Sequence, residues 1–259
     1  MTPEPTASPE ATPVPPRWLY DYNGDGTSEI GIFRPASGLW AIRGLTRVYF
    51  GQAGDSPVPA DYDGDGTTEV AVFRAGTGLW AARGVTRAYF GTTGDNPLPR
   101  DYSGDGTADI AVFRPSTGLW ALRNLDRIYY GTSTDSPVPG YYDSGPAVPA
   151  VFRDSTGLWA VRGLTRAYFG ASGDIPVPGD YHGAGEWTPA IWRVTNGLWA
   201  ARGATRVYYG AAGDREVPGG YAGDGVDRPA VFRPFTGLWA IRGVTRAYFG
   251  TVGDWRVSR

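Results

Sequence analysis

The chain has 259 residues, of which 41% are hydrophobic and 14% aromatic, and its formal charge at pH 7 is −2. It contains no Cys, one His (His182) and no Lys, so Arg supplies the basic charge. A disulfide framework, a Cys-ligated zinc site and a Lys-dependent phosphate loop are therefore excluded. The near-neutral charge argues against a dedicated nucleic-acid binder, and no apolar run is long enough to predict a membrane-spanning helix.

The first predicted element is a linker. Residues 1–16 contain Pro at six positions and no aromatic residue. Such a segment cannot bury enough apolar surface to offset the entropy lost on ordering, so residues 1–17 are expected to be extended and disordered. They lack the basic start and the apolar stretch of a signal peptide. A Pro- and Thr-rich linker before a compact module is typical of multi-domain secreted proteins, so this chain is expected to be one module of a longer one.

Residues 18–259 are predicted to form one domain from six copies of a unit of about 40 residues. The copies begin near residues 18, 57, 97, 137, 176 and 216, and a Gly-Leu-Trp motif marks each one. Its tryptophans are Trp40, Trp80, Trp120, Trp159, Trp199 and Trp239. This period, with several short strands per unit, predicts an all-β, six-bladed β-propeller with four antiparallel strands per blade. An open solenoid would need polar capping repeats, and the last copy is as apolar as the others.

Turn residues divide each unit into four predicted strands. In the second copy these are residues 57–62, 69–74, 79–83 and 86–90. The second strand is apolar on both faces, as expected for a sheet covered by a neighbouring blade on each side. The fourth strand alternates Arg87 and Tyr89 with smaller residues and is predicted to lie at the outer rim. For the first blade, residues 18–22 and 255–257 are both candidates for the first strand, and the sequence leaves the choice open.

Three units carry the same acidic loop between their first two strands. Oxygen-bearing side chains stand at loop positions 1, 3 and 5, a backbone carbonyl is available at 7, a carboxylate stands at 9, and Gly at 4 and 6 permits a sharp turn. Calcium takes about six to eight oxygen ligands from such flexible loops. The candidate ligands are Asp21, Asn23, Asp25, Thr27 and Glu29; Asp61, Asp63, Asp65, Thr67 and Glu69; and Asp101, Ser103, Asp105, Thr107 and Asp109.

The alternative is a plain hairpin turn, because Asp-Gly is a favoured turn pair. Three copies in register favour calcium, since the four acids of the second copy would repel one another without a cation. The loop is not an EF-hand, because its twelfth position is Ile32, Val72 or Val112 where that motif needs Glu.

The other three copies have lost ligands. The fourth is one residue shorter, the fifth lacks acids at positions 5 and 9, and the sixth has Gly220 at position 1 and Arg228 at position 9. Three Ca²⁺ sites are therefore predicted, in blades one to three. In the fifth loop, Asp180, His182 and Glu186 could make a small metal or acid–base site, but sequence drift after loss of calcium is the favoured interpretation.

Asp-x-(Asp/Asn)-Gly-Asp-Gly followed by an apolar strand, as at residues 21–26 and 61–66, resembles the FG-GAP repeat of integrin-α-like propellers. The longer pattern with Gly-Asp-x-Pro-Val-Pro, Val-Phe-Arg-Pro and Gly-Leu-Trp is similar to bacterial repeats of that class. The resemblance covers everything after the linker and implies a calcium-stabilised, typically extracellular propeller for adhesion or ligand binding. This chain has fewer blades than the integrin pattern, so integrin partner specificity is not carried over.

The other repeated residues are predicted to be mainly architectural. Arg recurs three times per unit, as Arg34, Arg43 and Arg47 in the first, and an Asp precedes each first strand. Arg stems are expected to pack across strands while their heads pair with these Asp residues or with loop carbonyls. The functional alternative is a multivalent lectin in which the six repeated Trp residues stack on sugars beside Tyr and Arg. A core between blades also needs a Trp in each blade, and that interpretation is favoured.

The expected function is that of a non-enzymatic, calcium-stabilised binding or adhesion module, secreted or at the cell surface, with a protein or glycan partner. The alternatives are a carbohydrate-binding lectin, a purely structural module and a propeller hydrolase, although no nucleophile constellation breaks the repeat symmetry. A monomer is expected, with a risk of strand exchange between near-identical edges. Three bound calcium ions would make the net charge positive and favour an acidic or hydroxyl-rich partner.

Overall fold

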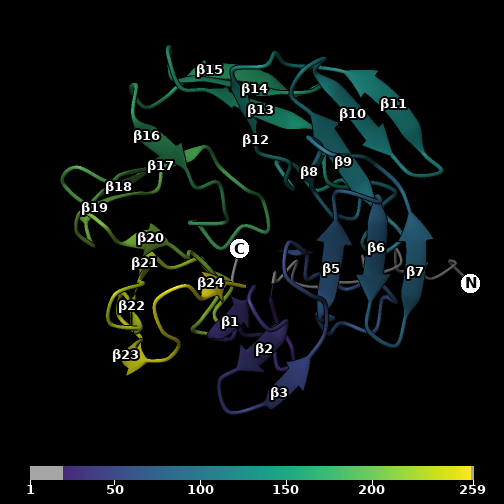
Figure 1. The fold of residues 1–259 in the computed structure, drawn as a ribbon. Helices are drawn as coiled ribbons and strands as arrows, with labels where there is room; N and C mark the ends of the chain where they lie inside the picture. Colours follow the sequence, from purple (N-terminus) through teal and green to yellow (C-terminus); the bar gives the residue numbers. More distant parts are fainter. Residues whose placement is uncertain (1–19, 258–259) are drawn as a thin grey trace, which may run out of the picture.

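Six four-stranded antiparallel sheets are arranged around a central axis, so the fold is the six-bladed β-propeller that the repeats predict (Figure 1). The computed structural model describes residues 20–257, and the predicted linker at residues 1–17 lies outside them. The part of the chain that the structure describes contains no helix that is long and apolar enough to cross a membrane. We number the blades one to six from the sheet that contains β1.

The strands fall into four sets from the centre of the ring outward (Figure 1). The innermost strands are β24 (Trp255–Arg256), β4 (Ser56–Pro57), β8 (Asn96–Pro97), β12 (Asp135–Pro137), β16 (Asp174–Pro176) and β20 (Arg215–Glu216). The second strands are β1 (Gly31–Arg34), β5 (Ala71–Arg74), β9 (Ala111–Arg114), β13 (Ala150–Arg153), β17 (Ala190–Arg193) and β21 (Ala230–Arg233). The third strands are β2 (Leu39–Ile42), β6 (Leu79–Ala82), β10 (Leu119–Leu122), β14 (Leu158–Val161), β18 (Leu198–Ala201) and β22 (Leu238–Ile241). The outermost strands are β3 (Thr46–Tyr49), β7 (Thr86–Tyr89), β11 (Asp126–Tyr129), β15 (Thr165–Tyr168), β19 (Thr205–Tyr208) and β23 (Thr245–Tyr248).

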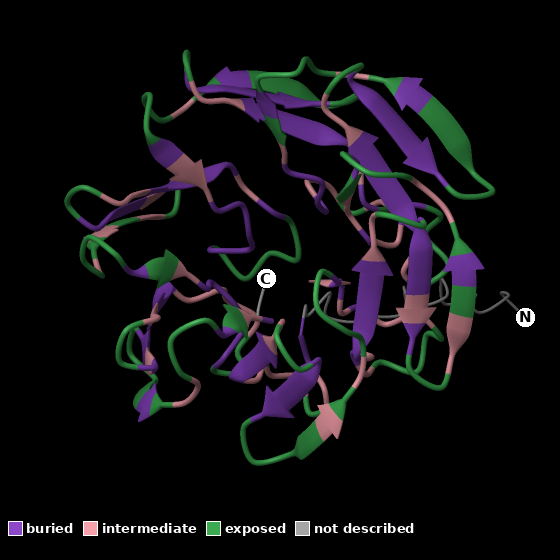
Figure 2. Ribbon diagram, viewed as in Figure 1, coloured by how far each residue is buried: buried purple, intermediate pink, exposed green. Residues whose placement is uncertain are grey.

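Burial follows this order, with the second and third strands buried and the outermost strands largely exposed (Figure 2). One face of each blade packs against the opposite face of the next blade. Between blades two and three, for example, Phe73 and Trp80 share a core cluster with Val112 and Leu119. This explains why the second and third strands are apolar on both faces, whereas the outermost strand alternates.

The predicted inner strand is longer than the observed one. In blade two β4 covers only Ser56–Pro57, and the chain then pairs again through a single bridge between Ala60 and Glu69. Pro57 and Pro59 have no N–H to donate, which limits a continuous ladder over residues 57–62. Sequence periodicity located the strand but not its length.

The ring closes through its C-terminal strand. β24 pairs with β1, with Phe33 opposite Trp255, so residues 255–256 complete blade one. Of the rival segment 18–22, residues 20–22 are not in a strand, and Trp18 and Leu19 lie outside the described residues. Tyr22 instead donates from its hydroxyl to the Val257 carbonyl at 2.8 Å. In blade two the equivalent Tyr62 hydroxyl donates to Val58, so Val257 stands where the repeat places Val58.

An Arg–Asp pair clamps the innermost strand to the second strand in every blade. Arg74 donates from Nε and Nη2 to the two oxygens of Asp55, at 2.7 and 2.9 Å, and Asp55 also accepts from the backbone N–H of Gln52. The six pairs are Arg34–Asp254, Arg74–Asp55, Arg114–Asp95, Arg153–Asp135, Arg193–Asp174 and Arg233–Asp214. Each Asp side chain is fully buried, so the predicted Arg–Asp pairing holds for one of the three repeated Arg residues of each unit, whereas the other two form no such pair within residues 20–257.

Candidate metal centre

The acidic loops lie near the axis of the ring, directly before the second strand of each blade, and in blades two to six they follow the innermost strand. In blade one, Asp21 at position 1 organises the loop: its carboxylate accepts the backbone N–H groups of Gly24 at 2.7 Å and Gly26 at 2.8 Å. Gly24 and Gly26 both have positive φ, which explains why Gly stands at loop positions 4 and 6. Blades two and three repeat these bonds through Asp61 and Asp101.

This loop shape does not by itself identify a metal site. Asp180 in the fifth loop accepts the N–H groups of Gly183 and Gly185, both at 2.7 Å, although that loop lacks the acids at positions 5 and 9. His182 and Glu186 are exposed. The carboxylate at position 1 therefore stabilises the backbone conformation of the first, second, third and fifth loops alike. Whether a loop can also hold a metal ion depends on the residues at its other positions.

In the first two loops the remaining carboxylates converge. One oxygen from each of Asp61, Asp63, Asp65 and Glu69 lies within 4.8 Å of the others, and Asp21, Asp25 and Glu29 form a similar group. None of the four acids in the second loop has an ion pair with an Arg among residues 20–257. Hard oxygen ligands held this close by a flexible loop suit Ca²⁺.

In the second loop, hydrogen bonds from Thr67 and from the backbone of Tyr62 hold two of the four carboxylates in place. The Thr67 hydroxyl and its backbone N–H both donate to Asp65 at 2.7 Å, and these bonds lower the pKa of Asp65. Glu69 accepts the Tyr62 N–H at 2.7 Å, but burial of its carboxylate raises its pKa to about 7, with repulsion from Asp63, Asp61 and Asp65 adding to the shift. Glu29 has the same pKa of about 7, again mainly through burial. A cation would relieve this cost.

The third loop differs because Asp replaces Glu at position 9. Asp101, Asp105 and Asp109 do not make a convergent group in the described part of the chain, unlike the first two loops. The Asp109 side chain is one methylene shorter, and its carboxylate is held by the N–H groups of Tyr102 and Ser103, both at 2.9 Å. Ser103 turns its hydroxyl to Asp101 at 3.3 Å. The predicted ligands are thus present in this loop but not gathered.

The other three loops satisfy their polar groups internally. In the sixth loop Arg228 at position 9 forms an ion pair with Asp224 at position 5, so a guanidinium stands where the first three loops have a carboxylate. In the fourth loop Asp143 accepts the N–H of Gly145 at 2.9 Å. Thr188 at position 9 of the fifth loop donates to the Gly179 carbonyl at 3.4 Å.

Neighbouring loops are joined to one another by backbone hydrogen bonds. The carbonyl of the position-1 residue accepts from the N–H of the position-8 residue of the next blade, as in Thr68 to Asp21 at 2.6 Å. The same bond occurs at every blade junction, ending with Ser28 to Gly220 at 3.4 Å across the closure. The sequence does not reveal this ring of bonds, because the residue at position 8 varies from Ser to Trp and only its backbone takes part.

The six repeated Trp residues lie in the core, with exposed fractions of 0–1%. Each donates its indole N–H to the backbone carbonyl ten residues later, as Trp80 does to Phe90 at 2.9 Å. Each also packs against an aromatic residue of the adjacent strand, with 5.0–5.9 Å between the ring centroids. Their ring faces are therefore not open to a sugar. This placement favours the core interpretation over the lectin interpretation of these residues.

Comparisons with known proteins add no assignment. A scan against models of protein families, a search of curated proteins and a search of solved structures each found no match to this chain.

Proposed function

We propose that this chain is a non-enzymatic binding module of the secreted or cell-surface kind, stabilised by Ca²⁺ in the loops of blades one to three. The observation that carries the proposal is the convergence of Asp61, Asp63, Asp65 and Glu69 within 4.8 Å, with no Arg of residues 20–257 in an ion pair with them. The extracellular and adhesive role rests on the resemblance of the loops to FG-GAP repeats.

The three loops differ in how far the fold prepares them for the ion. The second loop offers four gathered carboxylates, the first offers three together with Asn23, and the third has its acids apart. Because calcium affinity rises with ligand charge and pre-organisation, we expect affinity to decrease in the order second, first, third. Bound ions would stabilise the ring as a whole, since each loop is bonded to its neighbours.

Isothermal titration of the metal-free protein with CaCl₂ tests the proposal. We expect heat from no more than three sites per chain, little response to Mg²⁺, and loss of the tightest site in Glu69→Gln. Glu186→Gln in the fifth loop is the matched control, because it removes an exposed loop acid outside the predicted sites. The absence of calcium heat, or more than three sites, would overturn the proposal.

A further inference from the structure

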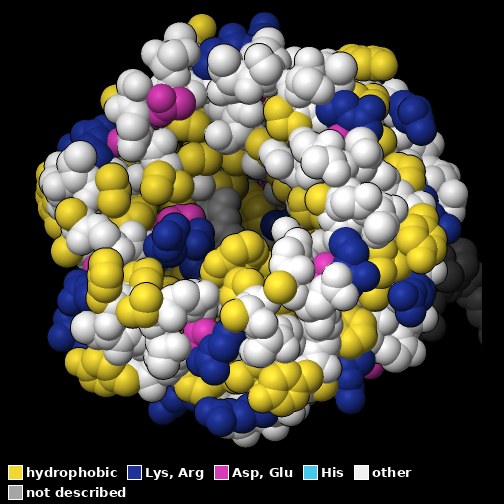
Figure 3. Space-filling model, in the orientation of Figure 1, with side chains coloured by type: hydrophobic (Ala, Val, Ile, Leu, Met, Phe, Trp, Pro, Cys, Tyr) yellow, Lys and Arg dark blue, Asp and Glu magenta, His cyan; other side chains and the backbone are white. Residues whose placement is uncertain are grey.

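Charge is segregated between the inside and the outside of the ring. Each blade exposes two Arg residues on its outer wall, one after the third strand and one on the outermost strand, such as Arg83 and Arg87 in blade two. None of these has an ion pair within residues 20–257, whereas most acids lie in the axial loops or in the buried Arg–Asp pairs. Basic side chains accordingly follow the outer edge of the ring (Figure 3).

A pocket of about 520 Å³ opens on this wall between blades one and two. Its volume falls within the ~300–1,000 Å³ typical of small-ligand sites. Blades that radiate from an axis diverge with radius, and Gly51, Ala81 and Gly84 leave the space between them partly unfilled. Phe50 of blade one, with Leu79 and Ala81 of blade two, gives the pocket an apolar lining.

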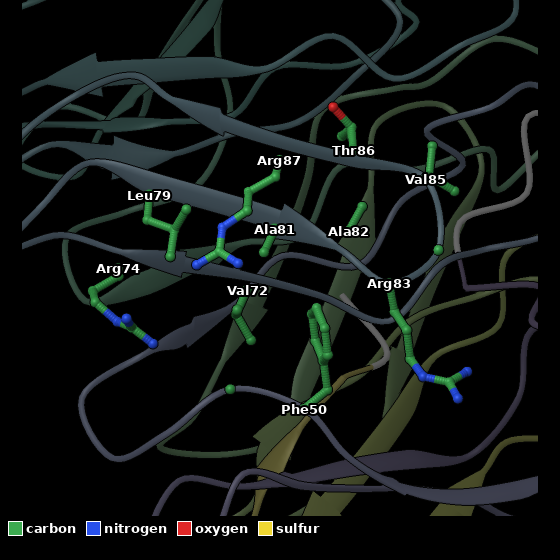
Figure 4. A pocket seen from close by; sticks show the side chains of 12 residues that line it. Phe50, Val72, Arg74, Leu79, Ala81, Ala82, Arg83, Val85, Thr86 and Arg87 are labelled. Carbon is green, nitrogen blue, oxygen red and sulfur yellow. The ribbon is translucent and has the colours of Figure 1, made fainter.

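Three arginines line the same pocket. Arg74 and Arg87 direct their guanidinium groups to one end of it and Arg83 lies at the other (Figure 4). Arg74 is already paired with Asp55, but Arg83 and Arg87 have no recorded side-chain partner in the described residues. Two cationic forks beside an apolar surface, with no acid to neutralise them, are arranged for an anion that also has an apolar face.

Strand register repeats the placement of the outer-strand Arg and Tyr in every blade. Arg87 stands opposite Ala81, and Tyr89 opposite Leu79, and the other five blades have the same pairs. The arginines of this set are Arg47, Arg87, Arg127, Arg166, Arg206 and Arg246. The accompanying Tyr residues are 66–75% exposed, which is unusual for so large a side chain repeated in every blade.

We infer that the outer wall binds an acidic polysaccharide, with the carboxylate of a uronic acid on the outer-strand Arg and the sugar ring over the apolar pocket and the Tyr. A guanidinium holds a carboxylate through two parallel hydrogen bonds, and an aromatic face covers the C–H side of a ring. Weak sites repeated around one ring would add through avidity on a polymer. This inference rests on the proposed binding role and names its ligand class.

The same features fit a nucleic acid less well. A phosphodiester chain needs neutralisation at one phosphate after another along a continuous groove. Here the pocket between blades one and two is a discrete one, the outer-strand Arg residues stand one to a blade, and the axial loops concentrate acids that repel such a chain. A carboxylated sugar needs one cationic fork and one apolar face per site, which is what each blade offers.

Titration with a β-1,4-linked glucuronic acid hexamer tests the inference against cellohexaose, which has the same backbone without the carboxylates. We expect binding of the acidic hexamer only. Replacing all six outer-strand Arg residues by Gln should weaken it by at least about tenfold, and replacement by Lys should weaken it partly, because Lys keeps the charge but not the fork. Circular dichroism melting checks that both variants fold, as expected for exposed residues without ion pairs.

Equal binding of cellohexaose, equal or tighter binding of a single-stranded DNA of matched charge, or unchanged binding by the Gln variant would each overturn the inference. Unchanged binding of the acidic hexamer by the Lys variant would also overturn the inference, since positive charge alone would then suffice for binding. These outcomes are separate from the calcium titration, which is done without sugar. A protein that binds calcium but not the acidic hexamer contradicts only the ligand class.

Discussion

At the scale of single residues, position 9 of the axial loop decides how the loop is satisfied. Glu69 brings a fourth carboxylate to the group in blade two, Asp109 leaves the acids of its loop apart, and Arg228 puts a guanidinium beside Asp224 in blade six. The side chain at this one position therefore separates a loop with gathered carboxylates from a loop whose charge is neutralised by an Arg.

The substitution Asp109→Glu should complete the third loop. The extra methylene lets the carboxylate reach the oxygens of Asp101 and Asp105 as Glu69 reaches those of its own loop. We expect the weakest calcium affinity of the wild-type protein to increase by about tenfold, as one more properly placed anionic ligand allows. Calcium titration measures it, with Thr188→Glu in the fifth loop as a control that should create no site. An unchanged or weaker third site would contradict this explanation of the blade-three loop.

The pKa values of Glu29 and Glu69 give the metal-free protein a distinctive pH dependence. Burial raises both from an ordinary 4.5 to about 7, so between these values the folded state binds more protons than the unfolded chain. Their contribution to stability is full below pH 4.5 and is lost as the pH rises through 7. The pKa values of Asp25, Asp65 and Asp105 are lowered, so these groups change the stability of the protein only at more acidic pH.

Melting curves of the metal-free protein between pH 4.5 and 7 measure this loss of stability. Comparison with the double variant Glu29→Gln/Glu69→Gln separates the contribution of these two carboxyls from that of the other groups. The wild type should lose stability relative to the variant between pH 4.5 and 7. Calcium needs the deprotonated carboxylates, so its affinity should rise over the same range and its binding should release protons. A wild type that instead gains stability relative to the variant would reverse the sign and refute the role of burial.

At the scale of the blade, the Arg–Asp clamp ties a very short inner strand to the sheet. Two residues of β4 pair with β5, and the bidentate bond from Arg74 to the fully buried Asp55 adds a side-chain link at the end of that ladder. The two partners are not equivalent, because the Arg74 side chain keeps 29% of its surface exposed while Asp55 keeps none.

Arg74→Gln should therefore cost more stability than Asp55→Asn. The first leaves a buried carboxylate without a counter-charge and should cost about 2–3 kcal/mol, below the ~3–5 kcal/mol of a fully buried pair because water reaches the arginine. The second keeps an acceptor for the Gln52 N–H and leaves Arg74 free to turn to water, so about 1 kcal/mol is expected. Urea unfolding of both variants gives the comparison. Equal losses would show that burial of the Asp is not the deciding factor.

Blade number, strand order and loop position could be predicted from the sequence because the repeat places the same residue types at the same spacing six times. Three features could not. The reach of Asp109 depends on one methylene, the inter-loop bonds use only backbone atoms, and the outer pocket depends on how far neighbouring blades diverge. Ring closure did leave a signal, since Asp254 and Val257 repeat the spacing of Asp55 and Val58, whereas Trp18 would put a much larger side chain at the Val58 position.

At the scale of the whole molecule, closure concentrates several contacts on the last described residues. Arg34 binds Asp254 at 2.7 Å, Arg256 pairs with Glu216 of blade six at 2.5 Å, and the Val257 N–H donates to Gly31 at 3.0 Å. Glu216 and Arg256 stand where the inner strands of other blades carry Pro57 and Pro97. The closing strand is thus held to both of its neighbours, blade one by pairing and blade six by an ion pair.

Deletion of residues 254–259 should open the ring. It removes β24, the partner of Arg34 and the buried Val257, and we expect a loss of about 5 kcal/mol and a fall in Tm of about 10 °C or more. The bare edge of β1 would also be free to pair with another chain, so dimers or larger species should form. Size-exclusion chromatography with light scattering and thermal melting measure both effects, and deletion of residues 1–16 is the control. A monomer with unchanged Tm would mean that the ring is held shut by its inter-blade cores and not by the closing strand.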